Sequence, residues 1–221
     1  MSNTVLITGA NRGIGLEMAR LWQQRGDAVI AVCRRASAQL QALGVEVIEG
    51  IDVSDPAAVQ QLADTLAGRP LDVLYNNAGI LGRETLDDLD FTQIQRQFEV
   101  NTLGPLRVTH ALLANLHQGS KVGLMTSRMG SIADNSSGAR YGYRISKAGL
   151  NAAGKSLAVD LAPLGIAVAI LHPGWVQTEM TGGSGQLTAE EAANRLLARM
   201  DELTLETSGT FWHSDGSVLP W

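Results

Sequence analysis

The sequence contains one cysteine and six prolines, and aromatic residues make up only 5% of the chain. A single cysteine cannot form an intramolecular disulfide, so a disulfide-stapled fold is excluded and a reducing compartment is expected. No apolar run approaches the ~18 residues that a membrane-spanning helix requires, and an expected first strand from Thr4 leaves no room for a signal peptide. We therefore expect a cytoplasmic protein that does not enter a membrane. Cys33 lies in an apolar stretch and is interpreted as a core residue.

An excess of positive charge is also lacking, because the formal net charge is −5. Binding to a nucleic-acid backbone needs a basic surface, so nucleic acid is not an expected partner. His110 and His117 are not spaced to share a ligand and have no accompanying cluster of cysteines or carboxylates, so no metal site is predicted. A chain of 221 residues with 45% hydrophobic content suits one domain, residues 1–221, with a full core.

Short apolar stretches alternate with segments of helical periodicity along the whole chain. Strands are predicted near residues 4–8, 28–33, 45–49, 71–75, 121–126, 167–171 and 209–212. Asp55 and Pro56 suit the first turn of a helix, and a helix over Tyr143–Leu164 is expected to end at Gly165. This alternation predicts an α/β protein with a three-layer, doubly wound (Rossmann) fold and a mostly parallel sheet of about seven strands.

A glycine-rich turn follows the first predicted strand. Gly9, Gly13 and Gly15 stand between the strand Thr4–Thr8 and an amphipathic segment, Leu16–Arg25. Glycine lets the backbone approach a pyrophosphate, and the free N–H groups at a helix start favour negative charge. The spacing GxxxGxG therefore indicates a phosphate cradle, with an ordinary glycine turn as the alternative.

The segment YRISK places Tyr143 and Lys147 one helical turn apart. Side chains at i and i+4 share one face of a helix, so the ammonium can stabilise an ionised phenol and lower its pKa. A phenol shifted toward neutrality can act as an acid or a base. Tyr141 lacks such a partner, because Ile145 stands four residues after it.

Further motifs occur in a fixed order along nearly the whole chain: Asn76-Asn77-Ala78-Gly79 after an apolar strand, Asn101 in a later helix, Ser127, and Pro173-Gly174 followed by Thr178. Together with the glycine turn and YxxxK, this order resembles the short-chain dehydrogenase/reductase family. The stretches CRR, YGYRISKAGLN and HPGWVQTEM are most similar to its C-factor or sniffer-like carbonyl reductase branch.

The resemblance implies a catalytic set of Asn101, Ser127, Tyr143 and Lys147. Tyr143 would protonate a carbonyl oxygen as hydride arrives, or act as base in the reverse direction, and Lys147 would also bind the nicotinamide ribose. Ser127 would hold the substrate oxygen, although the gap to Tyr143 leaves Ser131 as an alternative.

Asn101 precedes Pro105 by four residues within an expected helix. Proline has no N–H, so the Asn101 carbonyl loses its usual donor and can accept from a water. In the resembled family such a site joins a proton relay through the lysine. The alternative is a simple proline kink.

Cofactor choice depends on the residues after the second strand, where NAD enzymes carry an acid for the ribose 2′-hydroxyl. Here Arg34 and Arg35 follow instead, and two guanidiniums suit a 2′-phosphate, with Arg12 as a third contact. We therefore expect NADPH in preference to NADH. Asp52 would accept from the adenine amine and Thr178 would hold the carboxamide. The predicted cofactor-binding residues are Gly9, Asn11, Arg12, Gly13, Ile14, Gly15, Arg34, Arg35, Asp52, Val53, Asn77, Ala78, Gly79, Tyr143, Lys147, Pro173, Gly174, Val176 and Thr178.

The leading hypothesis is an NADPH-dependent oxidoreductase acting on a small carbonyl or alcohol substrate, whose identity and reaction direction stay open. The alternative is an NADPH-binding sensor or signalling protein with little turnover. The resemblance and the long helices expected over Phe91–Leu116 and Tyr143–Leu164 predict a homodimer or homotetramer. The glycine-rich segment Met180–Leu187 is expected to form a mobile lid.

Overall fold

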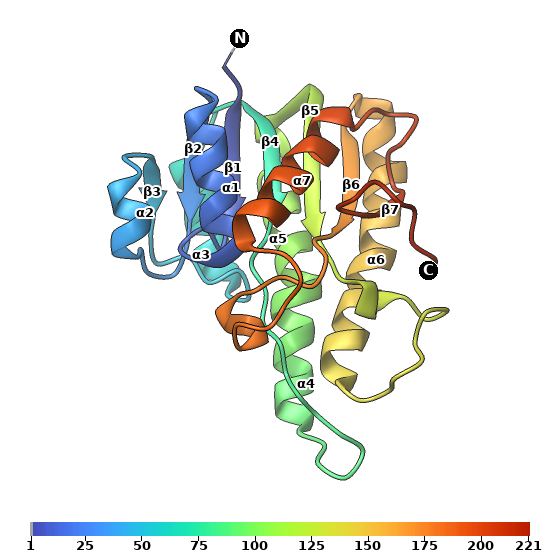
Figure 1. Cartoon of the computed structure of the whole chain (residues 1–221). Coiled ribbons are helices and arrows are strands. Elements are labelled where there is room, and N and C mark those ends of the chain that lie inside the picture. Colours follow the sequence, from blue (N-terminus) through green and yellow to red (C-terminus); the bar gives the residue numbers. More distant parts are fainter. Residues whose placement is uncertain (1) are drawn as a thin grey trace.

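The computed structural model describes residues 2–221 and contains one parallel sheet of seven strands. The strand order is β3-β2-β1-β4-β5-β6-β7, and every neighbouring pair is parallel. The strands are β1 Thr4–Thr8, β2 Ala28–Val32, β3 Glu46–Ile48, β4 Leu71–Asn76, β5 Leu116–Met125, β6 Ala167–His172 and β7 Phe211–His213. The predicted doubly wound α/β fold is confirmed (Figure 1).

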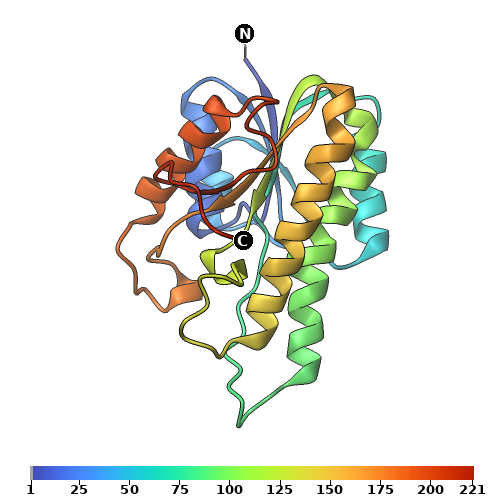
Figure 2. The same ribbon diagram turned by 90° about the vertical axis from the view of Figure 1, so that its right-hand side faces the viewer.

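Helices cover both faces of the sheet, which gives three layers (Figure 2). The helices are α1 Gly13–Gln24, α2 Ala38–Ala42, α3 Pro56–Thr65, α4 Phe91–Phe98, α5 Gly104–Ala111, α6 Tyr141–Leu161 and α7 Ala189–Glu202. The first and last of the long helices, α1 and α7, pack together on one face, while α3, α4, α5 and α6 lie on the other.

The buried strands explain this arrangement. In β1, Val5 and Ile7 pack against the α1 and α7 face, whereas Leu6 points into the core on the opposite face. Side chains alternate along a strand, so a strand covered on both sides reads as a continuous apolar run. The polar residues then fall at the carboxyl ends, where they can form a site.

The long helix expected over Phe91–Leu116 is interrupted. It consists of α4, a π-helical turn at Glu99–Leu103, α5 and a short 3-10 turn at Leu113–Asn115, and β5 already begins at Leu116. The i→i+4 hydrogen-bond pattern cannot continue past Pro105, which has no N–H to donate. A wider turn takes its place, as is common near functional sites.

Other local predictions are close to the structure. Asp55 caps α3 by accepting from the N–H of Ala57, with Pro56 in the first turn. The helix predicted over Tyr143–Leu164 begins two residues earlier, at Tyr141, and its final turn ends at Gly165, whose φ is 71°. The last strand is displaced from residues 209–212 to 211–213, since Gly209 has a φ of 72° and forms a turn.

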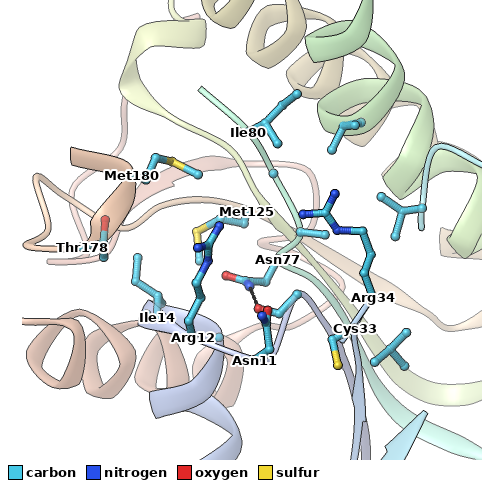
Figure 3. Close-up of a pocket in the computed structure, with 18 of the residues that line it drawn as sticks. Asn11, Arg12, Ile14, Cys33, Arg34, Asn77, Ile80, Met125, Thr178 and Met180 are labelled. Carbon is cyan, nitrogen blue, oxygen red and sulfur yellow. Dashed lines mark hydrogen bonds between the residues drawn. The ribbon is translucent and has the colours of Figure 1, made fainter. Parts of the chain in front are cut away.

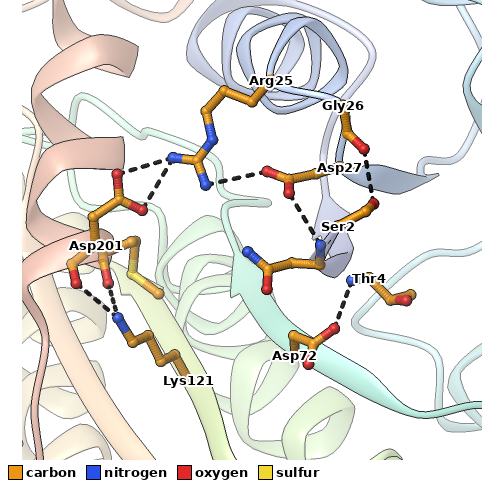
Figure 4. A network of polar contacts seen from close by, with 10 residues as sticks. Ser2, Thr4, Arg25, Gly26, Asp27, Asp72, Lys121 and Asp201 are labelled. Carbon is orange, nitrogen blue, oxygen red and sulfur yellow. Dashed lines mark hydrogen bonds and ion pairs between the residues drawn. The ribbon is translucent and has the colours of Figure 1, made fainter.

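The amino ends of the strands carry a polar network, at the edge of the sheet opposite to the carboxyl ends of the strands (Figure 4). Arg25 pairs with both carboxylate oxygens of Asp201, at 3.0 and 2.9 Å, and with Asp27 at 3.1 Å. Lys121 donates to the Asp201 carbonyl at 2.9 Å. Thr4 donates its N–H to Asp72 at 2.7 Å. These contacts join α1, α7 and the central strands and have a structural role. Within residues 2–221 no helix combines the length and apolar character needed to cross a membrane.

Candidate active site

A cavity of about 230 Å³ opens at the carboxyl ends of the parallel strands. Most of the predicted cofactor-binding residues line it, together with Val32, Cys33, Ile51, Ile80, Arg96, Val100, Met125, Thr126, Glu179 and Met180, which the sequence did not identify. Figure 3 shows Arg12 and Arg34 extending into the cavity, with Thr178 and Met180 on one side. Of the predicted site residues, Arg35, Asn101, Ser127, Gly174 and Val176 do not line it.

The glycine turn gives this cavity an anion-binding wall. Gly9 and Gly13 have φ values of 66° and 54°, in the left-handed region that glycine tolerates. A Cβ on Gly15 would lie 2.5 Å from the Gly9 carbonyl oxygen, so only glycine allows this approach. No side chain caps the start of α1 at Arg12. The first N–H groups of this helix therefore remain available to an anion, as a dinucleotide pyrophosphate requires.

The segment after β4 holds the glycine turn in place. The Asn77 side-chain amide donates to the carbonyl oxygens of Thr8 and Gly9, at 3.0 Å each. The Thr8 hydroxyl accepts from the N–H groups of Asn77 and Ala78, at 3.1 Å each. Asn77 thus lines the cavity and also braces it.

The part of the cavity that lies at the carboxyl end of β2 carries cations. Arg34 lines it and lies 3.9 Å from Asp52, whereas Arg35 is exposed outside it. Burial raises the pKa of Asp52, but hydrogen bonds from Ser54 and the charges of Arg34 and Arg96 outweigh that effect and lower the pKa overall. Arg96, on α4, is a second cation in this wall. Its only signal in the sequence is its position five residues before Asn101.

Tyr143 and Lys147 come together at the inner part of the cavity. The Lys147 ammonium donates to the Met125 carbonyl at 2.7 Å and lies 5.7 Å from the centre of the Tyr143 ring. Burial lowers the pKa of Lys147 to about 7. Burial also raises the pKa of the half-buried Tyr143, while a hydrogen bond with Ser127 and the charge of Arg140 act in the opposite direction. The expected lowering of the phenol pKa by Lys147 is thus wrong for this structure, because desolvation dominates.

The two candidate serines have different surroundings. Ser127 is buried next to Tyr143, where it acts to lower the pKa of the phenol, and its hydroxyl accepts from the Met129 N–H at 3.2 Å. The hydroxyl of Ser131 donates to the Trp221 carbonyl at 3.0 Å and accepts from the Asp134 N–H at 3.1 Å. Ser131 therefore fastens the 3-10 turn after β5 to the segment that follows β7, and only Ser127 adjoins the phenol.

Asn101 is fully buried behind the cavity, in the π-helical turn. Its side chain donates to the Ile80 carbonyl at 2.9 Å and to the Ser146 hydroxyl at 3.0 Å, and it accepts from the Ile80 N–H at 2.8 Å. These bonds attach the segment after β4 to α6 beside Lys147.

The segment Met180–Leu187, which the sequence predicts to be a mobile lid, contains several backbone hydrogen bonds. The N–H groups of Gln186 and Leu187 both donate to the Trp175 carbonyl, at 2.7 and 3.1 Å, and the Gly183 N–H donates to the Thr178 carbonyl at 2.8 Å. These backbone hydrogen bonds attach the segment to the rest of the protein, although it has no large side chain between Thr181 and Gln186 that could do so. Arg12 reaches this region and forms an ion pair with Glu179.

Comparisons with known proteins agree with this geometry. Residues 3–188 match the short chain dehydrogenase family. The 1-hydroxy-2-glutathionyl-2-methyl-3-butene dehydrogenase of Rhodococcus sp. (strain AD45) is 44% identical over 225 residues, which cover 99% of this chain and 100% of the relative. The carbonyl reductase Sniffer of D. melanogaster has a TM-score of 0.91 at 30% identity, covering 100% of both chains. A carbonyl reductase from Pseudomonas aeruginosa PAO1 in complex with NADP has a TM-score of 0.89 at 35% identity and the same coverage. The chain therefore belongs to the short-chain dehydrogenase/reductase family and is an oxidoreductase.

Proposed function

We propose that this protein is an NADPH-dependent reductase of small carbonyl compounds that also oxidises the corresponding alcohols. The observation that carries the proposal is that Tyr143 and Lys147 line one end of a cavity whose other end is the glycine turn, with Ser127 buried directly beside Tyr143. When bound, the nicotinamide cofactor supplies or accepts a hydride.

The side chains of the site supply the proton, orient the substrate and bind the cofactor. Tyr143 holds the proton that a carbonyl oxygen takes up during reduction, and its raised pKa keeps it protonated at neutral pH. Ser127 orients the same oxygen through its hydroxyl. Lys147, buried beside Tyr143, binds a ribose hydroxyl, and Asn101 keeps the surrounding backbone in position.

Preference for NADPH is supported by Arg34, which lines the cavity after β2 where an NAD-specific site carries an acid. The nearest carboxylate, Asp52, already accepts from the Ser54 N–H at 2.9 Å and hydroxyl at 2.6 Å. The structural neighbour solved with NADP agrees with this choice. NADH is the weaker cofactor in the proposal.

The substrate class is a small molecule with a secondary or primary alcohol, or the matching ketone or aldehyde. The Rhodococcus relative is named for a hydroxylated glutathione conjugate, so bulky thioether-bearing alcohols belong among the candidates. A signalling role with little turnover is not favoured, because it would require none of Ser127, Tyr143 and Lys147. A cytoplasmic homodimer or homotetramer completes the proposal, the compartment resting on the free thiol of Cys33.

Initial rates of NADPH oxidation with a panel of ketones, aldehydes and quinones test the reductive direction. Reduction of NADP by alcohols, among them glutathione-conjugated ones, tests the reverse. Turnover that disappears in Tyr143→Phe supports the proposal. Tight NADPH binding with no turnover on any panel member would favour the sensor instead.

A further inference from the structure

An ion pair crosses the mouth of the cavity. Arg12, at the start of α1, donates to the carboxylate of Glu179, in the 3-10 turn that follows Thr178. Both residues line the cavity, and their side chains are 63% and 74% exposed. No acidic residue other than Glu179 pairs with Arg12 in the part of the chain that the structure describes.

The Glu179 end of this pair is held firmly. The Thr178 N–H donates to the Thr181 hydroxyl at 3.1 Å, and that hydroxyl donates to the Val176 carbonyl at 2.8 Å. The turn therefore presents the carboxylate of Glu179 from a fixed backbone. The Arg12 guanidinium stands on a long flexible stem, so Arg12 is the partner that moves when the pair breaks.

The strand order places Glu179 and Arg34, beside which the 2′-phosphate is proposed to bind, on opposite sides of the strand that precedes Arg12. Arg12 follows β1, Arg34 follows the adjacent β2, and Glu179 follows β6, three strands away on the other side. Neighbouring strands lie about 4.8 Å apart. A guanidinium directed at Glu179 is thus directed away from Arg34, beside which the 2′-phosphate of NADPH is proposed to bind.

We propose that Glu179 is a specificity-determining residue, which competes with the 2′-phosphate of NADPH for the Arg12 guanidinium and so limits the preference for NADPH over NADH. This inference rests on the proposed use of NADPH. A phosphate dianion outcompetes an exposed carboxylate for arginine, but breaking the ion pair reduces the net gain. NADH has no 2′-phosphate and leaves the pair intact.

The test measures dissociation constants by calorimetry for 2′,5′-ADP and 5′-AMP, which differ only in the 2′-phosphate and need no turnover. We expect Glu179→Gln to tighten binding of 2′,5′-ADP about two- to five-fold relative to 5′-AMP, and the gain to shrink at high salt. Glu206→Gln, which removes an exposed charge with no ion pair in the described residues, is the matched control and should change neither affinity.

A second background isolates the role of Arg12. In Arg12→Gln, the further change Glu179→Gln should leave the ratio of the two dissociation constants unchanged. An equal effect of Glu179→Gln on both ligands, no effect on either, or a gain that persists without Arg12 would each overturn the inference. Equal affinities for the two ligands in the unaltered protein and in Glu179→Gln would overturn the NADPH proposal as well, which separates the two failures.

Discussion

The ammonium of Lys147 lies 5.7 Å from the centre of the Tyr143 ring and donates to the Met125 carbonyl rather than to the phenol oxygen. Both side chains lie in the same desolvated part of the cavity. Desolvation moves their pKa values toward the uncharged forms, lowering that of Lys147 and raising that of Tyr143. The phenol of Tyr143 therefore keeps its proton, which the carbonyl oxygen of a substrate requires during reduction.

The lowered pKa of Lys147 predicts a pH-dependent stability of the cofactor-free protein. The pKa is about 7 in the folded state against an ordinary value of 10.5. Between these values the unfolded chain binds a proton that the folded protein does not, so the free energy of unfolding rises with pH across this window. Below pH 7 Lys147 is protonated in both the folded and the unfolded protein. The buried ammonium then lowers the free energy of unfolding by its full amount. Urea unfolding below pH 7 and near pH 10 should show this rise, and Lys147→Met should remove that part of it. An identical pH dependence in the variant would contradict the assigned pKa.

Tyr143→Phe should lower turnover by about 10²- to 10⁴-fold, because it deletes the proton donor and keeps the ring. The dissociation constant for NADPH should stay within a few fold. Rates must be measured under conditions where the chemical step limits turnover. Substantial residual activity there would count against Tyr143 as the acid.

Ser127→Ala and Ser131→Ala form a matched pair. The first should abolish most of the turnover, because Ser127 lies beside Tyr143, and should lower the free energy of unfolding by only about 1 kcal/mol, because a single hydrogen bond from the Met129 N–H is lost. The second should lower the free energy of unfolding by about 1 to 3 kcal/mol and leave turnover of the folded protein largely intact, because two partly buried hydrogen bonds, to the Trp221 carbonyl and from the Asp134 N–H, are lost. Measurements of turnover and of chemical unfolding for both variants show which serine is catalytic. A large loss of turnover in Ser131→Ala but not in Ser127→Ala would make Ser131 the catalytic serine.

Arg34→Ala should reduce the preference for NADPH over NADH, whereas Arg35→Ala should not, because only Arg34 lines the cavity. The lost contact is worth about 1.5 kcal/mol, at the low end for charge-assisted hydrogen bonds since Arg34 is exposed. The ratio of dissociation constants for the two cofactors is the readout. A larger effect of Arg35→Ala would place the 2′-phosphate outside this cavity.

The outer faces of α4 and α6 predict self-association. Phe91, Ile145 and Val159 are 73%, 51% and 63% exposed, and the two residues on α6 lie about four turns apart on one side. We expect light scattering to detect a dimer or tetramer of the 23.5 kDa chain, and Ile145→Asp to dissociate it. Leu205→Asp, at a 50% exposed leucine outside these helices, is the control. A purely monomeric species at micromolar concentration would refute the prediction.

The elements of the fold and most of the residues that line the cavity could be predicted from the sequence, because they depend on neighbours in the chain. An apolar run buried on both faces, the glycines of the turn between β1 and α1, and the Asp55 cap are each defined by a few consecutive residues. The order of these local signals placed Tyr143, Lys147 and the glycine turn at one edge of the sheet. The π-helical turn could be inferred only in part, since Pro105 breaks the hydrogen-bond pattern without dictating what replaces it.

Whatever depends on distances across the fold was decided by the tertiary structure. Which of Arg34 and Arg35 enters the cavity, and which of Ser127 and Ser131 meets the phenol, follows from how strands and loops direct adjacent side chains. The direction of the Tyr143 pKa follows from desolvation by segments distant in the chain, which a YxxxK spacing does not contain. The pairing of Arg12 with Glu179, 167 residues apart, likewise exists only because parallel strands bring their carboxyl ends to one edge.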